Sequence, residues 1–259
     1  RDFCLSRGLG DVYKRQDAVV VAFTILLGAG LGRLLKMDRD TALLTSIGSS
    51  ICGAAAVLGA EPVVKSQPYK AAVAVSTVVI FGTLSMFLYP ALFRAGMLDL
   101  TTEQMGLFTG ATLHEVAHVV GAGNAMGQAI SDPAIIVKMI RVMMLAPVLV
   151  ILSIILSRRE AAAGQTGQKR KITIPWFAFL FLAVIGFNSL HLLPSGVVSA
   201  INSLDTFLLT MAMTALGAES SFEKFKKAGA RPFLLAALLY AWLFFGGYWL
   251  VKGMTAWMA

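Results

Sequence analysis

Two basic side chains, Lys138 and Arg141, lie inside an apolar segment of the sequence. Asp132 and Pro133 make a good helix start, and at about 1.5 Å per residue the basic residues lie roughly 8 and 12 Å into that helix. Because they are spaced i and i+3, they share one face and could hold a doubly charged oxyanion. We expect Arg141 to approach the middle of the membrane and Lys138 to reach headgroups and water. The alternative is a purely structural pairing of Arg141 with Glu115.

Residues 114–118, HEVAH, match the helical zinc-protease signature H-E-x-x-H, in which two histidines one turn apart bind metal and the glutamate is the general base. A catalytic zinc also needs a third protein ligand, and the candidates, Asp205 and His191, lie in no recognisable ligand motif. Another interpretation makes His114 and Glu115 an intramembrane proton-coupling or ion-coupling pair, and a third makes them a polar contact between helices. We favour the coupling pair, and we expect no enzymatic activity, no metal and no cofactor.

Small and polar residues interrupt the apolar stretch 45–62, TSIGSSICGAAAVLGAEP. Glycine weakens a helix by about 1 kcal/mol relative to alanine and serine offers competing hydrogen bonds, so a break is expected here. The stretch 208–221, LLTMAMTALGAESS, has the same character. Two interrupted spans in corresponding places indicate a transporter's binding site, although small residues also serve ordinary helix packing. The residues expected to line the site are Ser49, Ser50, Cys52 and Gly53 on one broken helix and Thr210, Met213 and Gly217 on the other.

The composition is that of an integral membrane protein. The chain is 57% hydrophobic and 14% charged, with a mean hydropathy of +0.76, which leaves too few polar residues to cover a soluble globule. The formal net charge of +8 is attributed to cytoplasmic loops and to contact with anionic lipid headgroups. We therefore expect the lipid bilayer as a partner and no nucleic acid.

Eight segments have about the length that a membrane-spanning helix needs. They are 17–35, 42–64, 71–93, 105–126, 134–156, 174–193, 197–217 and 232–251. The segment that carries HEVAH is the least apolar. If it crosses, 13 lysines and arginines lie between segments on one side and 3 on the other, and if it does not, the split is 11 to 5. Because cytoplasmic loops are enriched in positive charge, we predict eight crossings with residues 158–171 in the cytoplasm.

With eight crossings, the interrupted spans 42–64 and 197–217 run in opposite directions through the membrane. The helices around each span are inverted as well, as in the inverted-topology repeats of secondary transporters. The predicted fold is an all-α, polytopic membrane protein with two discontinuous helices. Residues 17–100 form the C-terminal part of the first repeat and residues 101–259 the second. Residues 1–16 resemble translated adapter sequence, and we interpret them as a non-native leader that replaces the true N-terminus.

Several long motifs carry a family resemblance, among them SSICGAAAVLGAEPVVK, LHEVAHVVGAG, KMIRVMMLAP and LDTFLLTMAMTALG. From about residue 17 to its end, the chain resembles bacterial inner-membrane proteins named as sulfate exporters, many of which are described only as conserved hypothetical membrane proteins. That family is similar in architecture to cation/proton antiporters and bile-acid symporters, whose two discontinuous helices cross at the substrate site. His118 departs from the family pattern, in which glutamine is more frequent, and this departure counts against a zinc site.

The residues and the resemblance together predict a multi-pass secondary transporter of the bacterial inner membrane. Its substrate would be a small inorganic anion, sulfate or a related sulfur oxyanion. Helix N-termini at the breaks would bind the anion, Lys138 and Arg141 would add positive potential, and His114 with Glu115 would couple protons or sodium. A sodium/proton antiporter of the same fold and an intramembrane zinc protease are the alternatives, and the chain could form a homodimer.

Overall fold

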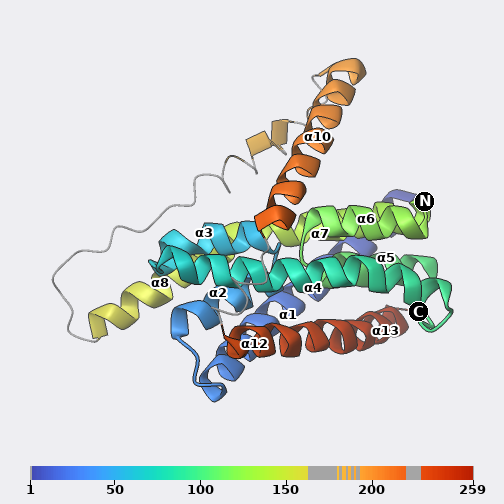
Figure 1. Cartoon of the computed structure of the whole chain (residues 1–259). Coiled ribbons are helices and arrows are strands. Elements are labelled where there is room, and N and C mark those ends of the chain that lie inside the picture. Colours follow the sequence, from blue (N-terminus) through green and yellow to red (C-terminus); the bar gives the residue numbers. More distant parts are fainter. Residues whose placement is uncertain are drawn as a thin grey trace.

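The computed structural model describes residues 2–162, 180, 183–184, 186–187, 190, 193–219 and 229–258. Every regular element in these ranges is a helix, which confirms the predicted all-α class. In chain order the elements in Figure 1 are α1 (Asp2–Leu34), α2 (Arg39–Ser50), α3 (Ala54–Val64), α4 (Pro68–Arg94), α5 (Thr102–Thr112), α6 (Val116–Met126), α7 (Gln128–Met143), α8 (Leu145–Ala162), α10 (Ser195–Glu219), α12 (Ala230–Ala241), the π-helical turn η1 (Trp242–Gly246) and α13 (Gly247–Met258).

The first interrupted segment forms a helical hairpin, in which α2 and α3 are joined by a turn at residues 51–53. The ammonium of Lys70, at the start of α4, lies 2.8 Å from the carboxylate of Asp38 and 2.9 Å from that of Asp40, at the start of α2. Three residues separate α3 from α4. The first hairpin therefore begins and ends beside the start of α4, which we call the Lys70 end (Figure 1).

The second hairpin consists of α5 and α6, joined by a turn at residues 113–115. Arg94, the last residue of α4, donates a hydrogen bond of 2.7 Å to the carbonyl of Ala125, near the end of α6. Seven residues separate Arg94 from α5, so this hairpin begins and ends beside the end of α4, which we call the Arg94 end. The two hairpins enter the bundle from opposite ends (Figure 1).

These contacts correct the prediction that 42–64 and 105–126 cross the membrane. Each segment has the length of a span, but a turn at its middle returns the chain to the end from which it came. Irregular backbone at membrane depth is tolerated where protein buries it, and all residues of both turns are buried. Hydropathy reports the length of an apolar segment and not its direction, so it could not distinguish a hairpin from a crossing.

The predicted break within 197–217 is also wrong, because α10 is one continuous helix. The hydroxyls of Thr206, Thr210 and Thr214 each donate to the carbonyl four residues earlier in the same helix. These polar side chains are thus satisfied without any interruption of the backbone. The second discontinuous segment is α5–α6 instead, and α10 leads away from the other helices (Figure 1).

Four helical segments of the described chain are long and apolar enough to cross a membrane: Gln16–Leu34, Pro68–Arg94, Gln128–Arg158 and Ala230–Met254. The last of them runs from the Lys70 end to the Arg94 end. At its start Arg231 donates to the carbonyl of Lys36 at 3.1 Å, and near its finish Lys252 lies 2.6 Å from Asp99. The protein is therefore a polytopic membrane protein. The predicted segment 174–193 lies mostly outside the described residues.

Small residues allow the hairpins to pack closely. A Cβ at Gly48 of α2 would lie 2.6 Å from Cγ2 of Val57 in α3, and one at Gly110 of α5 would lie 2.8 Å from Cβ of Val137 in α7. Both distances are shorter than a normal contact between carbon atoms, so a larger residue would push the helices apart. This packing brings the turns of both hairpins together inside the bundle.

Candidate functional site

The turns of the two hairpins meet at the centre of the bundle, and Gly53 allows them to approach each other. Its φ of 70° belongs to the left-handed region that favours glycine. A Cβ at this position would also lie 2.9 Å from Oε1 of Glu115, in the opposite turn. Gly53 is therefore required both by the reversal of the first hairpin and by the position of Glu115.

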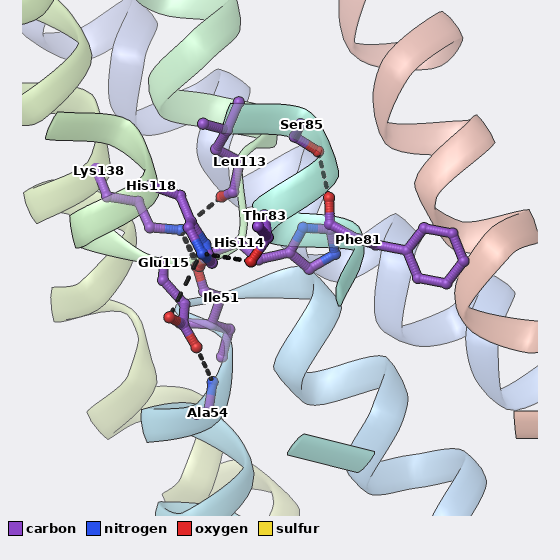
Figure 2. Close-up of polar contacts among 10 residues, drawn as sticks. All are labelled: Ile51, Ala54, Phe81, Thr83, Ser85, Leu113, His114, Glu115, His118 and Lys138. Carbon is purple, nitrogen blue, oxygen red and sulfur yellow. Dashed lines mark hydrogen bonds and ion pairs between the residues drawn. The ribbon is translucent and has the colours of Figure 1, made fainter. Parts of the chain in front are cut away.

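Lys138 of α7 joins the two turns (Figure 2). Its ammonium donates to the carbonyl of Ile51 at 2.8 Å in the first turn, and to those of Leu113 at 2.7 Å and His114 at 2.6 Å in the second. An ammonium has three N–H donors, so all of them are used. The side chain is fully buried, which corrects the expectation that Lys138 would reach headgroups and water.

Arg141, one helical turn further along α7, also binds both hairpins. Its guanidinium donates from Nε to the carbonyl of Ser50 at 2.7 Å, from Nη2 to that of Ser49 at 3.2 Å, and from Nη1 to that of Ala111. These carbonyls belong to the last turns of α2 and α5. The C-terminal end of a helix has unpaired carbonyls and a partial negative charge, so a cation stabilises it. The stabilisation of these two helix ends by Arg141 does not involve Glu115.

Glu115 occupies the complementary position at the start of α3. Its Oε1 accepts a hydrogen bond of 3.2 Å from the backbone N–H of Ala54, the first residue of that helix, where the helix dipole favours a negative charge. Its Oε2 lies 3.8 Å from Nδ1 of His118 (Figure 2). Nε2 of His118 in turn lies 3.3 Å from the hydroxyl of Thr83 in α4. The side-chain partner of Glu115 is thus His118 and not the predicted His114.

His114 contributes its backbone carbonyl to the contact with Lys138. Its side chain is buried, and its Nδ1 has no hydrogen-bond partner in the described part of the chain. The ring lies 6.5 Å from the ring of Tyr240 in α12, measured between centroids. His114 therefore faces the fourth membrane-spanning segment, while Glu115 faces the first hairpin.

The HEVAH motif does not lie on one helix. α6 begins at Val116, so His114 and Glu115 belong to the turn before it. The zinc-protease signature needs both histidines on one helical face, and this arrangement does not provide that face. Among the residues that the structure describes, no three His, Cys, Asp or Glu side chains form a group that could hold a metal. His191, one proposed third ligand, lies outside these residues.

Eight of the predicted site residues are buried where the turns of the two hairpins meet: Ser49, Ser50, Cys52, Gly53, His114, Glu115, Lys138 and Arg141. The other three, Thr210, Met213 and Gly217, lie on α10, outside both turns. Thr210 is exposed, and its hydroxyl binds within its own helix.

Asp17 is a charged residue that sequence reasoning missed. It lies on α1 with no exposed surface, and neither carboxylate oxygen has a hydrogen-bond partner among the described residues. Asp17 is close enough to Arg141 and Lys138 for both charges to act on it. The available signal is a carboxylate at the first position of the apolar segment 17–35, a place that is typical of the boundary of a membrane span.

Comparisons with known proteins identify the family of this chain. Residues 8–236 match the family described as Conserved hypothetical protein 698. The chain belongs to this family. It is 65% identical over 243 residues to a UPF0324 membrane protein of Bacteroides thetaiotaomicron, an alignment that covers 93% of this chain and 72% of that relative.

Two further relatives are similar over most of the chain. A UPF0324 membrane protein of Pseudomonas aeruginosa is 52% identical, with 91% of this chain and 68% of the relative covered. The UPF0324 inner membrane protein YeiH of Escherichia coli K12 is 50% identical, with 89% and 66% covered. No solved structure matches the chain. The relatives confirm the predicted family and the bacterial inner membrane as the location, and their names specify no substrate.

Proposed function

We propose that this chain forms the core of a secondary transporter that moves a small inorganic anion, sulfate or a related sulfur oxyanion, across the inner membrane. The observation that carries the proposal is the meeting of two hairpins from opposite ends of the bundle at buried charges. Interrupted helices at corresponding places in two halves are typical of the substrate sites of transporters. Buried ionisable residues inside a membrane are usually functional.

The hairpins support alternating access because each of them faces a different end of the bundle. When the first hairpin moves away from α7, the centre opens toward the Lys70 end, and when the second moves, it opens toward the Arg94 end. The helix–hairpin–helix units α1 to α4 and α4 to α7 run in opposite directions, which supports an inverted repeat that shares α4. We propose this repeat in place of the repeats 17–100 and 101–259.

An anion can compete for the donors that hold the turns together. Of the five N–H donors of Arg141, three bind carbonyls and two remain for an oxyanion. Helix α6 begins without a side-chain cap, so its first backbone N–H groups also attract negative charge. Binding of an anion would weaken the hydrogen bonds that Arg141 donates to the carbonyls of Ser50 and Ala111. The loss of these bonds would release one hairpin.

A sodium/proton antiporter is the second candidate, and the observation that favours it is the pair of buried carboxylates. Asp17 and Glu115 could exchange a proton for a sodium ion, as carboxylates in membrane pumps and transporters do. Two cations and two carboxylates are buried at the centre, so the centre offers partners for a negative and for a positive substrate. Transport assays must therefore determine the sign of the substrate's charge. Transport of sodium without any anion would support this candidate against the first.

The test is transport by the full-length protein in proteoliposomes. We expect saturable uptake of radiolabelled sulfate or of another sulfur oxyanion, and loss of that uptake in Arg141→Gln. Arg158→Gln is the matched control, because Arg158 is exposed at the end of a membrane span. Uptake of labelled sodium in place of every oxyanion would refute anion transport.

A further inference from the structure

Four charged side chains are buried at the centre of the bundle, and their formal charges cancel. Asp17, Lys138 and Arg141 have a relative exposure of 0% and Glu115 of 6%. No other Asp, Glu, Lys or Arg side chain that the structure describes is buried. We call these four residues the central charge cluster. Two cations and two ionised carboxylates leave it with no net charge.

The two cations of the cluster are held in their charged form by geometry. Lys138 donates to three carbonyls and Arg141 donates to three more, and an uncharged lysine could not make all of its bonds. The carboxylates have fewer partners. Glu115 accepts one backbone N–H, and Asp17 accepts no hydrogen bond from any described residue. The carboxylates are therefore the members of the cluster that can change protonation.

The other titratable side chains that the structure describes around the two carboxylates are those of His114, His118 and Cys52. Glu115 faces His118 of α6 and Lys138 of α7, and the adjacent turn contributes the thiol of Cys52. Asp17 faces Lys138 and Arg141. His118 contacts the hydroxyl of Thr83 in α4. An anion that entered this centre alone would leave an uncompensated charge in a medium of low dielectric constant, which is strongly unfavourable.

We propose that the centre takes up one proton for each negative charge of the bound anion, with Glu115 and Asp17 as the proton acceptors. This inference rests on the proposed anion transport and specifies its coupling. Each proton moves from water to a carboxylate oxygen, and no other bond changes. A protonated Glu115 is a weaker acceptor for the N–H of Ala54, so the start of α3 becomes available to the anion. A doubly charged oxyanion uses both carboxylates, which makes its transport electroneutral.

The experiment measures binding of inorganic sulfate to the purified full-length protein in detergent at a series of pH values. A pH indicator in weak buffer records the protons taken up. For every proton coupled to binding, the apparent affinity falls about tenfold per pH unit while the carboxylates are ionised in the free protein. We expect Glu115→Gln and Asp17→Asn each to remove one proton from this count, and the double variant to bind sulfate independently of pH.

Asp132→Asn is the matched control, because Asp132 is exposed and its carboxylate accepts a hydrogen bond from Gln128 at the start of the same helix that carries Lys138. It should keep the proton count of the wild type. Glutamine at position 115 still offers a carbonyl oxygen to Ala54, so Glu115→Gln should fold. If a variant does not fold, the proton count of the wild type decides alone, since sulfate binding without proton uptake overturns the inference.

The outcomes separate the inference from the proposed function. Sulfate transport that proceeds with sodium, or with a proton count that neither variant changes, overturns the coupling and leaves anion transport intact. Absence of binding and transport for sulfate, sulfite, thiosulfate and phosphate overturns the proposed function and the coupling together. Transport with one proton fewer in each variant supports both.

Discussion

Glu115 accepts a hydrogen bond of 3.2 Å from the backbone N–H of Ala54, which lies 61 residues earlier in the chain and in the opposite hairpin. The contact places a carboxylate at the positive end of α3, while Lys138 and Arg141 bind carbonyls at the ends of α2 and α5 and in the turns. Each turn is thus held by charges supplied by the other hairpin or by α7.

We expect Lys138→Met to lower the stability of the folded protein at least as much as Arg141→Gln does. Without the ammonium, the carbonyls of Ile51, Leu113 and His114 are left buried and unpaired, at a cost of about 1–3 kcal/mol each. The yield of folded protein and its melting temperature in detergent measure the effect. Lys65→Met is the control, because Lys65 is exposed. A Lys138→Met protein as stable as this control would contradict the assigned hydrogen bonds.

Gly53→Ala should lose folded protein, since alanine disfavours a φ of 70° and its Cβ would meet Glu115. The cost should exceed about 1 kcal/mol. Gly30→Ala tests the same change in α1, where a Cβ meets no atom within 4 Å, and it should stabilise the helix by up to about 1 kcal/mol. Thermal unfolding of the two variants provides the comparison, and equal effects would argue against the contact with Glu115.

Cysteine accessibility should show that residues 39 and 65 share one side of the membrane and that residues 94 and 128 share the other. From residue 17 on, eight described lysines and arginines lie at the Lys70 end, and two, Arg94 and Lys252, at the Arg94 end, so the Lys70 end should face the cytoplasm. The eight are Arg33, Lys36, Arg39, Lys65, Lys70, Arg158, Arg159 and Arg231.

The accessibility test uses single cysteines in a protein without Cys4 and Cys52, labelled with an impermeant thiol reagent. Labelling of residues 39 and 65 from opposite sides would restore the first crossing. Labelling of residues 94 and 128 from opposite sides would restore the second. Either result would require a different position for the corresponding turn.

His118→Gln should leave folding intact and should not change the metal content of the purified protein. Glutamine can keep a hydrogen bond to Thr83, and His114 and Glu115 lie outside the helix that a zinc-protease motif requires. Elemental analysis of wild type and variant measures the metal. A stoichiometric zinc that disappears in His118→Gln would favour a protease.

The sequence was sufficient to predict the membrane class, the first break and the burial of Arg141 and Glu115, because a charge far inside an apolar segment is visible without a structure. It did not predict that Lys138 is fully buried. It was not sufficient to predict that segments 42–64 and 105–126 turn back. A hairpin and a crossing have the same hydropathy, and the loop charges were consistent with a split of 13 to 3. The ion pairs of Lys70, which identify the hairpin, join residues about 30 positions apart.

The site was predicted less completely than the fold, for a related reason. Gly217 and the threonines around it resemble the residues of the first break, but small residues serve continuous helices equally well. The break at 113–115 contains Leu113, His114 and Glu115 and no glycine. What stabilises it is Lys138, whose three partners come from two distant turns, and such an arrangement is not encoded in local spacing.

A single helix fixes the bases of both hairpins. α4 holds the first through Lys70 and the second through Arg94, and its rise of about 1.5 Å per residue keeps those anchors roughly 36 Å apart. Neither base can slide along the membrane normal without breaking its anchor. In the proposed transport cycle, opening is then confined to the inner ends of the hairpins, so a small solute would pass when two short arms bend while their outer ends stay in place.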